Sequence, residues 1–125
     1  MNNKEIESVS KLSGSKRYEY FIKKVADFEE VWGLYDNGWA VGESSDGNIN
    51  IPFWPKKEFA QLCSKEAWTG YLPKRITLED FMNNWLPGMN RDNRKPAIFY
   101  TEEDKGVVIE ITRLLNDLEE ELMKY

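Results

Sequence analysis

Apolar residues recur at two different spacings along this chain, and the spacing changes sharply between neighbouring segments. Where they fall three and four positions apart, the pattern predicts four amphipathic helices, over residues 15–28, 56–65, 77–87 and 112–125. Ser15 is expected to cap the first helix and Thr112 the last. Pro87-Gly88 is expected to end the third. The apolar stripe of the last helix should consist of Leu115, Leu118, Leu122 and Tyr125.

The segment after the first helix has the pattern of a β-hairpin. Asn37-Gly38 lies between two β-prone runs and predicts a two-residue turn, in which both residues adopt φ > 0. This register would pair Tyr35 with Ala40. One face of the hairpin and of the strand that follows would then be apolar and largely aromatic, with Trp32, Leu34, Trp39, Val41, Pro52 and Trp54.

Three further strands are predicted. A turn at Asp46-Gly47 brings residues 49–53 back beside the hairpin. Pro52 indicates that this strand either lies at an edge of the sheet or ends there. Residues 97–100 and 107–110 predict a second hairpin, with a polar turn between them. The connection from residue 67 to residue 75 has no regular pattern.

The predicted order of elements is α-βββ-α-α-ββ-α. Runs of strands joined by hairpins indicate the α+β class, with a mainly antiparallel sheet made of a three-stranded meander and a second hairpin. Residues 1–14 are polar and are expected to form a loosely ordered N-terminal arm, in which Ile6, Val9 and Leu12 could line a short helix. Residues 15–125 are expected to form a single domain.

Composition narrows the possible partners and the compartment. The 125 residues include 41% hydrophobic and 14% aromatic residues, which excludes a disordered chain. There is one cysteine, and no cationic segment leads into an apolar run, so we expect a cytoplasmic protein without a signal peptide or a membrane partner. The net charge of −5 arises within residues 101–125, and no basic stripe indicates a nucleic-acid partner.

Several short motifs together resemble one bacterial family. They are Val31-Trp32-Gly33-Leu34-Tyr35, Gly38-Trp39-Ala40, Phe53-Trp54-Pro55, Glu58-Phe59-Ala60, Gly70-Tyr71-Leu72-Pro73, residues 76–81, Trp85-Leu86-Pro87-Gly88 and Gly106-Val107-Val108. In these motifs the chain resembles the bacterial domain-of-unknown-function family numbered 2750, from about Arg17 to the C-terminus. The resemblance implies a compact bacterial protein, and it assigns no activity and no catalytic residue.

The sequence contains no recognisable motif for catalysis or for binding a metal or cofactor. There is no histidine, which removes most nucleophile–base pairs and most zinc and haem sites. Cys63 shares an apolar stripe with Phe59 and Leu62 and is interpreted as an inert core thiol. Asp46-Gly47-Asn48-Ile49-Asn50 imitates the start of a calcium loop but lacks its later ligands, so we expect neither a metal nor a cofactor.

The aromatic residues are the strongest functional signal. Core packing explains most of them, but a set of aromatic and basic residues could form a binding groove, with Trp39, Trp54, Trp68 and Tyr71 as its walls and Lys74 and Arg75 at its rim. We therefore expect a non-enzymatic module that binds a protein partner or a second copy of itself. Two alternatives remain open: an enzyme with a dispersed carboxylate, Tyr and Lys site, and an anion pocket at Lys56, Lys57, Lys74 and Arg75.

Overall fold

The computed structural model describes residues 2–125 and confirms the α+β class. Its helices are α1 (Asn3–Ser10), α2 (Gly14–Phe28), α3 (Lys57–Leu62), the 3₁₀ helix η1 (Glu66–Trp68), α4 (Leu78–Asp80), the π-helical η2 (Phe81–Trp85), α5 (Leu86–Arg91) and α6 (Ile111–Leu122). Its strands are β1 (Glu30–Tyr35), β2 (Gly42–Glu43), β3 (Ile49–Phe53), β4 (Leu72–Thr77), β5 (Lys95–Ile98) and β6 (Val107–Val108).

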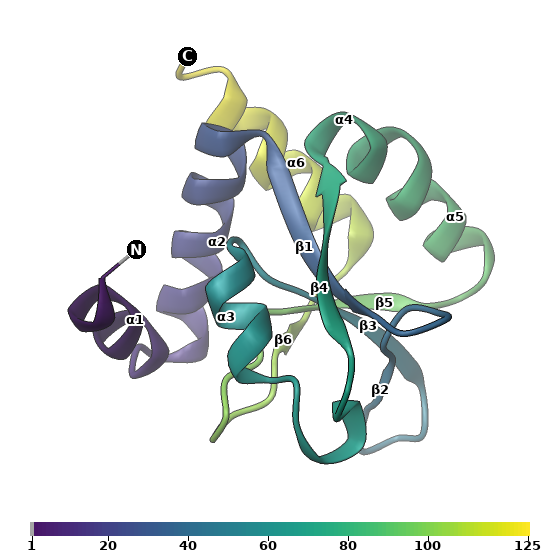
Figure 1. Cartoon of the computed structure of the whole chain (residues 1–125). Helices are drawn as coiled ribbons and strands as arrows, with labels where there is room; N and C mark the ends of the chain where they lie inside the picture. Colours follow the sequence, from purple (N-terminus) through teal and green to yellow (C-terminus); the bar gives the residue numbers. More distant parts are fainter. Residues whose placement is uncertain (1) are drawn as a thin grey trace.

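Two sheets share the core. β1 and β4 form an antiparallel ribbon, and a four-stranded sheet has the order β2-β3-β5-β6, in which β3 and β5 are parallel. The two sheets meet where Trp32 of β1 and Trp54, just after β3, exchange backbone hydrogen bonds of 2.9 and 2.8 Å. Figure 1 shows the ribbon running across the four-stranded sheet.

The predicted three-stranded meander is wrong in its first hairpin. Tyr35 pairs with Trp39 and not with Ala40, so the loop holds three residues. Asn37, with φ 55°, takes the left-handed conformation, and Gly38 does not. Beyond this short contact, β1 pairs along its whole length with β4, whose sequence we interpreted as irregular. Only one side chain of β4, Ile76, is buried, so β4 has no alternating apolar pattern.

Pro52 lies in an inner strand of the four-stranded sheet, so the expected edge position is wrong, whereas the alternative is nearly met because β3 ends one residue later at Phe53. β2 pairs with β3 only at Ile49 and Asn50, and β1 joins at Trp54. Backbone groups alternate between the two sides of a strand, so the nitrogen of Pro52 faces the gap between these two contacts. Its missing N–H therefore removes no hydrogen bond from the sheet.

The third predicted helix continues past Pro87-Gly88 as far as Arg91. Thr77 caps it, and its hydroxyl accepts a 3.1 Å hydrogen bond from the N–H of Asp80. The π turn of η2 separates α4 from α5, which places Pro87 in the first turn of the new α-helical segment. Proline is tolerated there because its missing N–H has no partner to lose.

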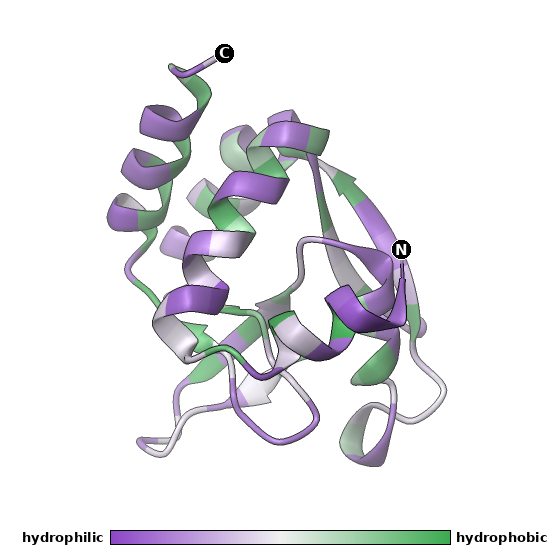
Figure 2. Cartoon of the chain, turned by 90° about the vertical axis from the view of Figure 1, so that its left-hand side faces the viewer, coloured by the Kyte–Doolittle hydropathy of each residue, from purple (hydrophilic) through white to green (hydrophobic). Residues whose placement is uncertain are grey.

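The terminal helices pack against the same core. Residues 3–10, expected to be part of a loose arm, form α1, in which Val9 is buried and Ile6 is half-buried. α2 buries Tyr18, Phe21, Ile22 and Val25, which recur at helical spacing, and its cap is Ser13 rather than Ser15. Figure 2 shows hydrophilic residues on the outer turns of α2 and α6.

The stripe predicted for α6 is partly wrong. Ile111, Leu114 and Leu118 are buried, whereas Leu115 is half-buried and Tyr125 is exposed. Glu110 rather than Thr112 is the capping residue, and it makes no side-chain capping hydrogen bond. Within residues 2–125, no helix is both long and apolar enough to cross a bilayer.

Candidate functional site

The paired aromatic rings form three clusters, and the tryptophans of the groove predicted from the sequence are divided between two of them. The third cluster, Tyr20, Phe59 and Phe99, contains none of the groove residues. The Trp39 cluster consists of Tyr35, Trp39, Phe53, Phe81 and Trp85. The Trp68 cluster consists of Trp54, Trp68 and Tyr100. Both are built from edge-to-face ring pairs, the geometry that aromatic quadrupoles favour.

The Trp39 cluster is closed. The Trp39 ring lies 4.7 Å from Trp85 and 5.1 Å from Tyr35 between centroids. It also rests on Gly33, where an added Cβ would lie 2.8 Å from a ring carbon of Trp39. On its remaining side, the Lys74 ammonium lies 4.0 Å from the Tyr35 centroid and 5.5 Å from that of Trp39. This cluster therefore already holds a cation of its own.

The Trp68 cluster stacks outward from the core toward solvent. Trp54 is fully buried, and its indole N–H donates a 2.9 Å hydrogen bond to the carbonyl of Tyr100. Trp68 is half-buried and crosses Trp54 at 89°, with its own N–H donating to the carbonyl of Val41 at 3.0 Å. Tyr100 lies 5.1 Å from Trp68 at 74°. Each indole is thus fixed by a hydrogen bond as well as by packing.

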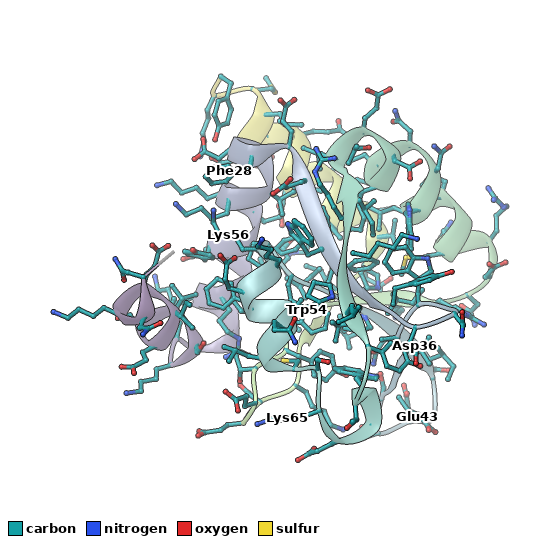
Figure 3. The ribbon with its side chains drawn as sticks, in the orientation of Figure 1. Phe28, Asp36, Glu43, Trp54, Lys56 and Lys65 are labelled. Atoms are coloured by element: carbon teal, nitrogen blue, oxygen red, sulfur yellow. The ribbon has the colours of Figure 1, made fainter. Side chains whose placement is uncertain are left out.

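Trp68 and Tyr100 line a cavity of about 550 Å³, which we call the cleft. Its walls come from three segments of the chain, and most of its surface is apolar. The lining residues are Val41, Gly42, Glu43, Ile49, Cys63, residues 65–68 and residues 100–105. Figure 3 places Glu43 and Lys65 at one end of the molecule, with Trp54 deeper inside.

Acidic side chains outnumber basic ones around the cleft. Five carboxylates belong to its lining, Glu43, Glu66, Glu102, Glu103 and Asp104, against the two lysines Lys65 and Lys105. Lys65 forms an ion pair with Glu102, and this bond raises the pKa of its ammonium group. The potential within the cleft is therefore negative.

A buried arginine holds the wall formed by residues 100–105. Arg17 of α2 is 1% exposed, and its guanidinium donates to the carbonyls of Phe99, Leu12 and Lys105 and to the Asp104 carboxylate, over 2.7 to 3.2 Å. Phe99 itself has φ 68°, a conformation that costs energy for a bulky residue and persists only where its surroundings hold it. The wall is therefore held in place by specific contacts.

A second set of hydrogen bonds positions the Tyr100 ring. Its hydroxyl donates to Oδ1 of the buried Asn50 at 3.4 Å, and Asn50 donates in turn to Ser44. Gly42 leaves room for this pair, since an added Cβ would lie 2.7 Å from both oxygens. Burial raises the pKa of Tyr100 above its ordinary value, so the hydroxyl stays protonated.

Cys63 lies at the inner end of the cleft and is buried, as the sequence predicts. Its thiol lies 3.4 Å from the carbonyl oxygen of Tyr100. Burial raises the pKa of the thiol to about 11. A thiol with this pKa is protonated at neutral pH and is a weak nucleophile.

The structure separates the six residues that the sequence indicated as binding residues. Trp54 is part of the core, Trp68 alone of the six lines the cleft, and Tyr71 is half-buried and does not line it. Trp39 and Lys74 belong to the other cluster, while Arg75 forms an ion pair with Glu30 at 2.5 Å.

The basic residues of the anion-pocket alternative do not converge on one cavity. Lys74 and Arg75 are neighbours in a strand and point to opposite sides, and Lys56 lies 3.6 Å from the ring of Phe28. None of these bases lines the cleft or either of the cavities of about 630 and 450 Å³. Among residues 2–125, no three side chains of the types Asp, Glu, Cys or His gather to hold a metal.

Sequence reasoning missed Arg17 and Tyr100. Arg17 lies four positions before Phe21 and hence on the buried stripe of α2, which was the available signal. Tyr100 directly follows the apolar run of β5. Residues 102–104 are exposed, as their interpretation as a turn requires, yet they also line the cleft.

Other cavities are less suited to a ligand. A cavity of about 630 Å³ lies between α1, α3 and residues 99–104, and one of about 450 Å³ lies between α2 and α6. Their linings are more polar than that of the cleft, and neither is lined by a tryptophan. Clustered aromatic side chains in a mostly apolar pocket favour the cleft.

The fold and the cleft define a small α+β protein with an aromatic, acidic cavity. Residues 18–118 match the model of a family described as a protein of unknown function, DUF2750. The match spans most of the chain, so the protein belongs to this family, as the motif resemblance indicated. No curated protein matches the chain.

Proposed function

We propose that this protein is a non-enzymatic binding module that holds an extended segment of a partner protein in the cleft. The observation that carries the proposal is the cleft itself, about 550 Å³ in volume, mostly apolar and walled by Trp68 and Tyr100. Ligand sites have volumes in this range and predominantly apolar linings. Trp and Tyr side chains are also the commonest energetic anchors at protein interfaces.

The walls of the cleft are organised before any ligand binds. The Trp68 indole is tied to Val41, and Arg17 anchors the segment that carries Tyr100. A site whose side chains are already immobilised loses less conformational entropy on binding. This rigidity supports a role in recognition.

The chemistry of the cleft favours binding over catalysis. The Cys63 thiol has its pKa raised to about 11 by burial, which disfavours the reactive thiolate. The Lys65 ammonium has its pKa raised by its bond to Glu102, whereas a nucleophilic lysine needs a lowered one. A reduced, buried thiol also suits a bacterial cytoplasm, where we place the protein.

Selection of peptides tests the proposal. A library of random twelve-residue peptides displayed on phage is selected on the folded protein, and the selected peptides are measured against Trp68→Ala and Leu72→Ser. Leu72 is 65% exposed and does not line the cleft, so its variant is the matched control. Loss of a tryptophan anchor should weaken binding at least about thirtyfold, and the control should bind as the native protein does.

Peptides that bind Trp68→Ala and the native protein equally would contradict the proposal, provided that both unfold at similar denaturant concentrations. Light scattering separates a related possibility. If the native protein forms a dimer that Trp68→Ala abolishes, the cleft is occupied by a second copy of the chain instead.

A further inference from the structure

The Trp68–Tyr100 corner of the cleft has the chemistry of a cation site. The two rings lie 5.1 Å apart at 74°, are half-buried and both face the cavity. Aromatic faces attract ammonium and guanidinium groups within about 6 Å, and more strongly where water is excluded. Two rings at a steep angle allow one cation to contact both.

Five other rings of the described chain already lie close to one of its own cations, whereas the half-buried Trp32, Tyr71 and Trp85 and the exposed Tyr125 do not. Lys24 lies 5.6 Å from the Tyr20 ring, Lys56 lies 3.6 Å from Phe28, and Arg113 lies 5.8 Å from Tyr18. Tyr35 and Trp39 share Lys74. Within residues 2–125, no Lys or Arg lies over Trp68 or Tyr100, although Lys65 belongs to the same lining. Lys65 pairs with Glu102 of the same lining, and its ammonium lies over neither ring.

Three carboxylates of the cleft have no basic partner among residues 2–125. Glu102 pairs with Lys65, and Asp104 with Arg17. Glu43, Glu66 and Glu103 belong to no ion pair of the described chain. Against them stands the single lysine Lys105, so a cation entering the cleft meets an excess of negative charge.

We infer that the segment bound in the cleft presents an arginine or lysine side chain to Trp68 and Tyr100, with its charge facing Glu66 and Glu103. The inference rests on the proposed function and names the chemistry of the partner. A free small cation would leave most of a 550 Å³ cavity empty, whereas a long basic side chain also covers apolar wall with its methylene groups. A peptide therefore satisfies both the apolar lining and the charge.

The sequences of the peptides selected above test this inference. Peptides whose binding depends on Trp68 should share an arginine or lysine at one position. Synthetic copies of these peptides, with citrulline in place of that arginine or norleucine in place of that lysine, keep the shape and lose the charge. The neutral copies should bind about tenfold more weakly, and the charged ones should weaken in high salt.

Substitutions that remove negative charge from the cleft test the same inference from the side of the protein. Glu66→Gln and Glu103→Gln should each weaken the cationic peptide several-fold and leave the neutral copy unchanged. Glu79→Gln, on an exposed position of α4 outside the cleft, is the matched control. All three positions are exposed, so folding is preserved.

The outcomes separate the two proposals. Trp68-dependent peptides without a shared basic residue, or neutral copies that bind as tightly as charged ones, would overturn the cation inference and leave the docking site standing. Failure to select any Trp68-dependent peptide would overturn both. A shift of the Trp68 indole N–H signal with the cationic peptide, assigned with Trp68→Phe, would support both.

Discussion

The Trp39 and Trp68 clusters are built alike and differ in what covers them. Each is a chain of edge-to-face pairs that begins at a fully buried ring, Phe53 or Trp54, and ends at half-buried ones. In the Trp39 cluster, Lys74 occupies the outer aromatic face. In the Trp68 cluster, the outer rings border the acidic cleft.

This difference shows that aromatic content alone does not locate a binding site. The five tryptophans look equivalent in the sequence, yet Trp39 and Trp85 lie in the cluster closed by the chain's own cation, and Trp54 and Trp68 lie in the open one. The open cluster is also the one whose surrounding wall is held by a buried arginine, Arg17. Openness together with a fixed wall distinguishes a candidate site from ordinary packing.

The largest expected effect is a difference in stability between variants at the buried ring of the Trp68 cluster, Trp54, and at its outer ring, Trp68. Trp54→Ala removes a fully buried side chain and a hydrogen bond to Tyr100, and should lower the free energy of unfolding by about 3–5 kcal/mol. Trp68→Ala removes a half-buried ring and should cost clearly less. Urea denaturation of both variants measures the difference, and equal costs would mean that Trp68 is also core.

The sequence predicted the class of fold and most of the helices because their apolar stripes are local. Tyr18, Phe21, Ile22 and Val25 recur at helical spacing, and all four are buried in α2. The Thr77 cap depends only on residues within one turn, so it too could be predicted. Local patterns are what a single sequence carries most reliably.

The pairing of β1 could not be predicted because its partner carries almost no apolar pattern. β4 contains Pro73, Lys74 and Arg75 and buries only Ile76, so it has the composition of a loop. The Asn-Gly pair favours a local hairpin, whereas the true partners, β1 and β4, are about forty residues apart along the chain. Long-range pairing of an exposed strand leaves little trace in composition.

The candidate site was predicted only in part for the same reason. Trp68 was identified, but Tyr100 and the acids of residues 102–104 reach it from a distant hairpin. Trp54 was expected on the same surface as Trp39, and the one-residue difference in register removes that expectation. Successive side chains of a strand point to opposite faces of the sheet, so a register error of one residue moves every side chain to the other face.

Glycine substitutions next to the Trp39 cluster test how closely it is packed, and an intermediate loss of stability is expected. Gly33→Ala places a methyl group 2.8 Å from the Trp39 ring, which Trp85 and Tyr35 hold on other sides, and should cost about 1–3 kcal/mol. Gly38→Ala is the matched control, since no heavy atom lies within 4 Å of its Cβ and its φ is not left-handed. Its effect should stay within about 0.5 kcal/mol.

Both variants are measured by urea denaturation and by binding of the cleft peptides. Gly33→Ala should destabilise the fold and leave peptide affinity intact, because the two clusters are separate. Equal stability of the two variants would show that the Trp39 ring moves freely. A loss of peptide binding in Gly33→Ala would show that the clusters are coupled.

The smallest expected effect concerns the cation that closes the Trp39 cluster. Lys74 is exposed, so its contact with Tyr35 and Trp39 should contribute about 0.5–1 kcal/mol, and Lys74→Met should lose no more than this. Lys57→Met, at an exposed position with no ring contact in the described chain, is the control and should be neutral. If a cation is what distinguishes the two clusters, Lys74→Met should also make the aromatic face available to a free cation. Added N-acetyl-arginine amide should then shift the Trp39 indole N–H signal in this variant only. The same shift in the native protein would mean that Lys74 does not occupy the ring, and the contrast between a closed and an open cluster would fail.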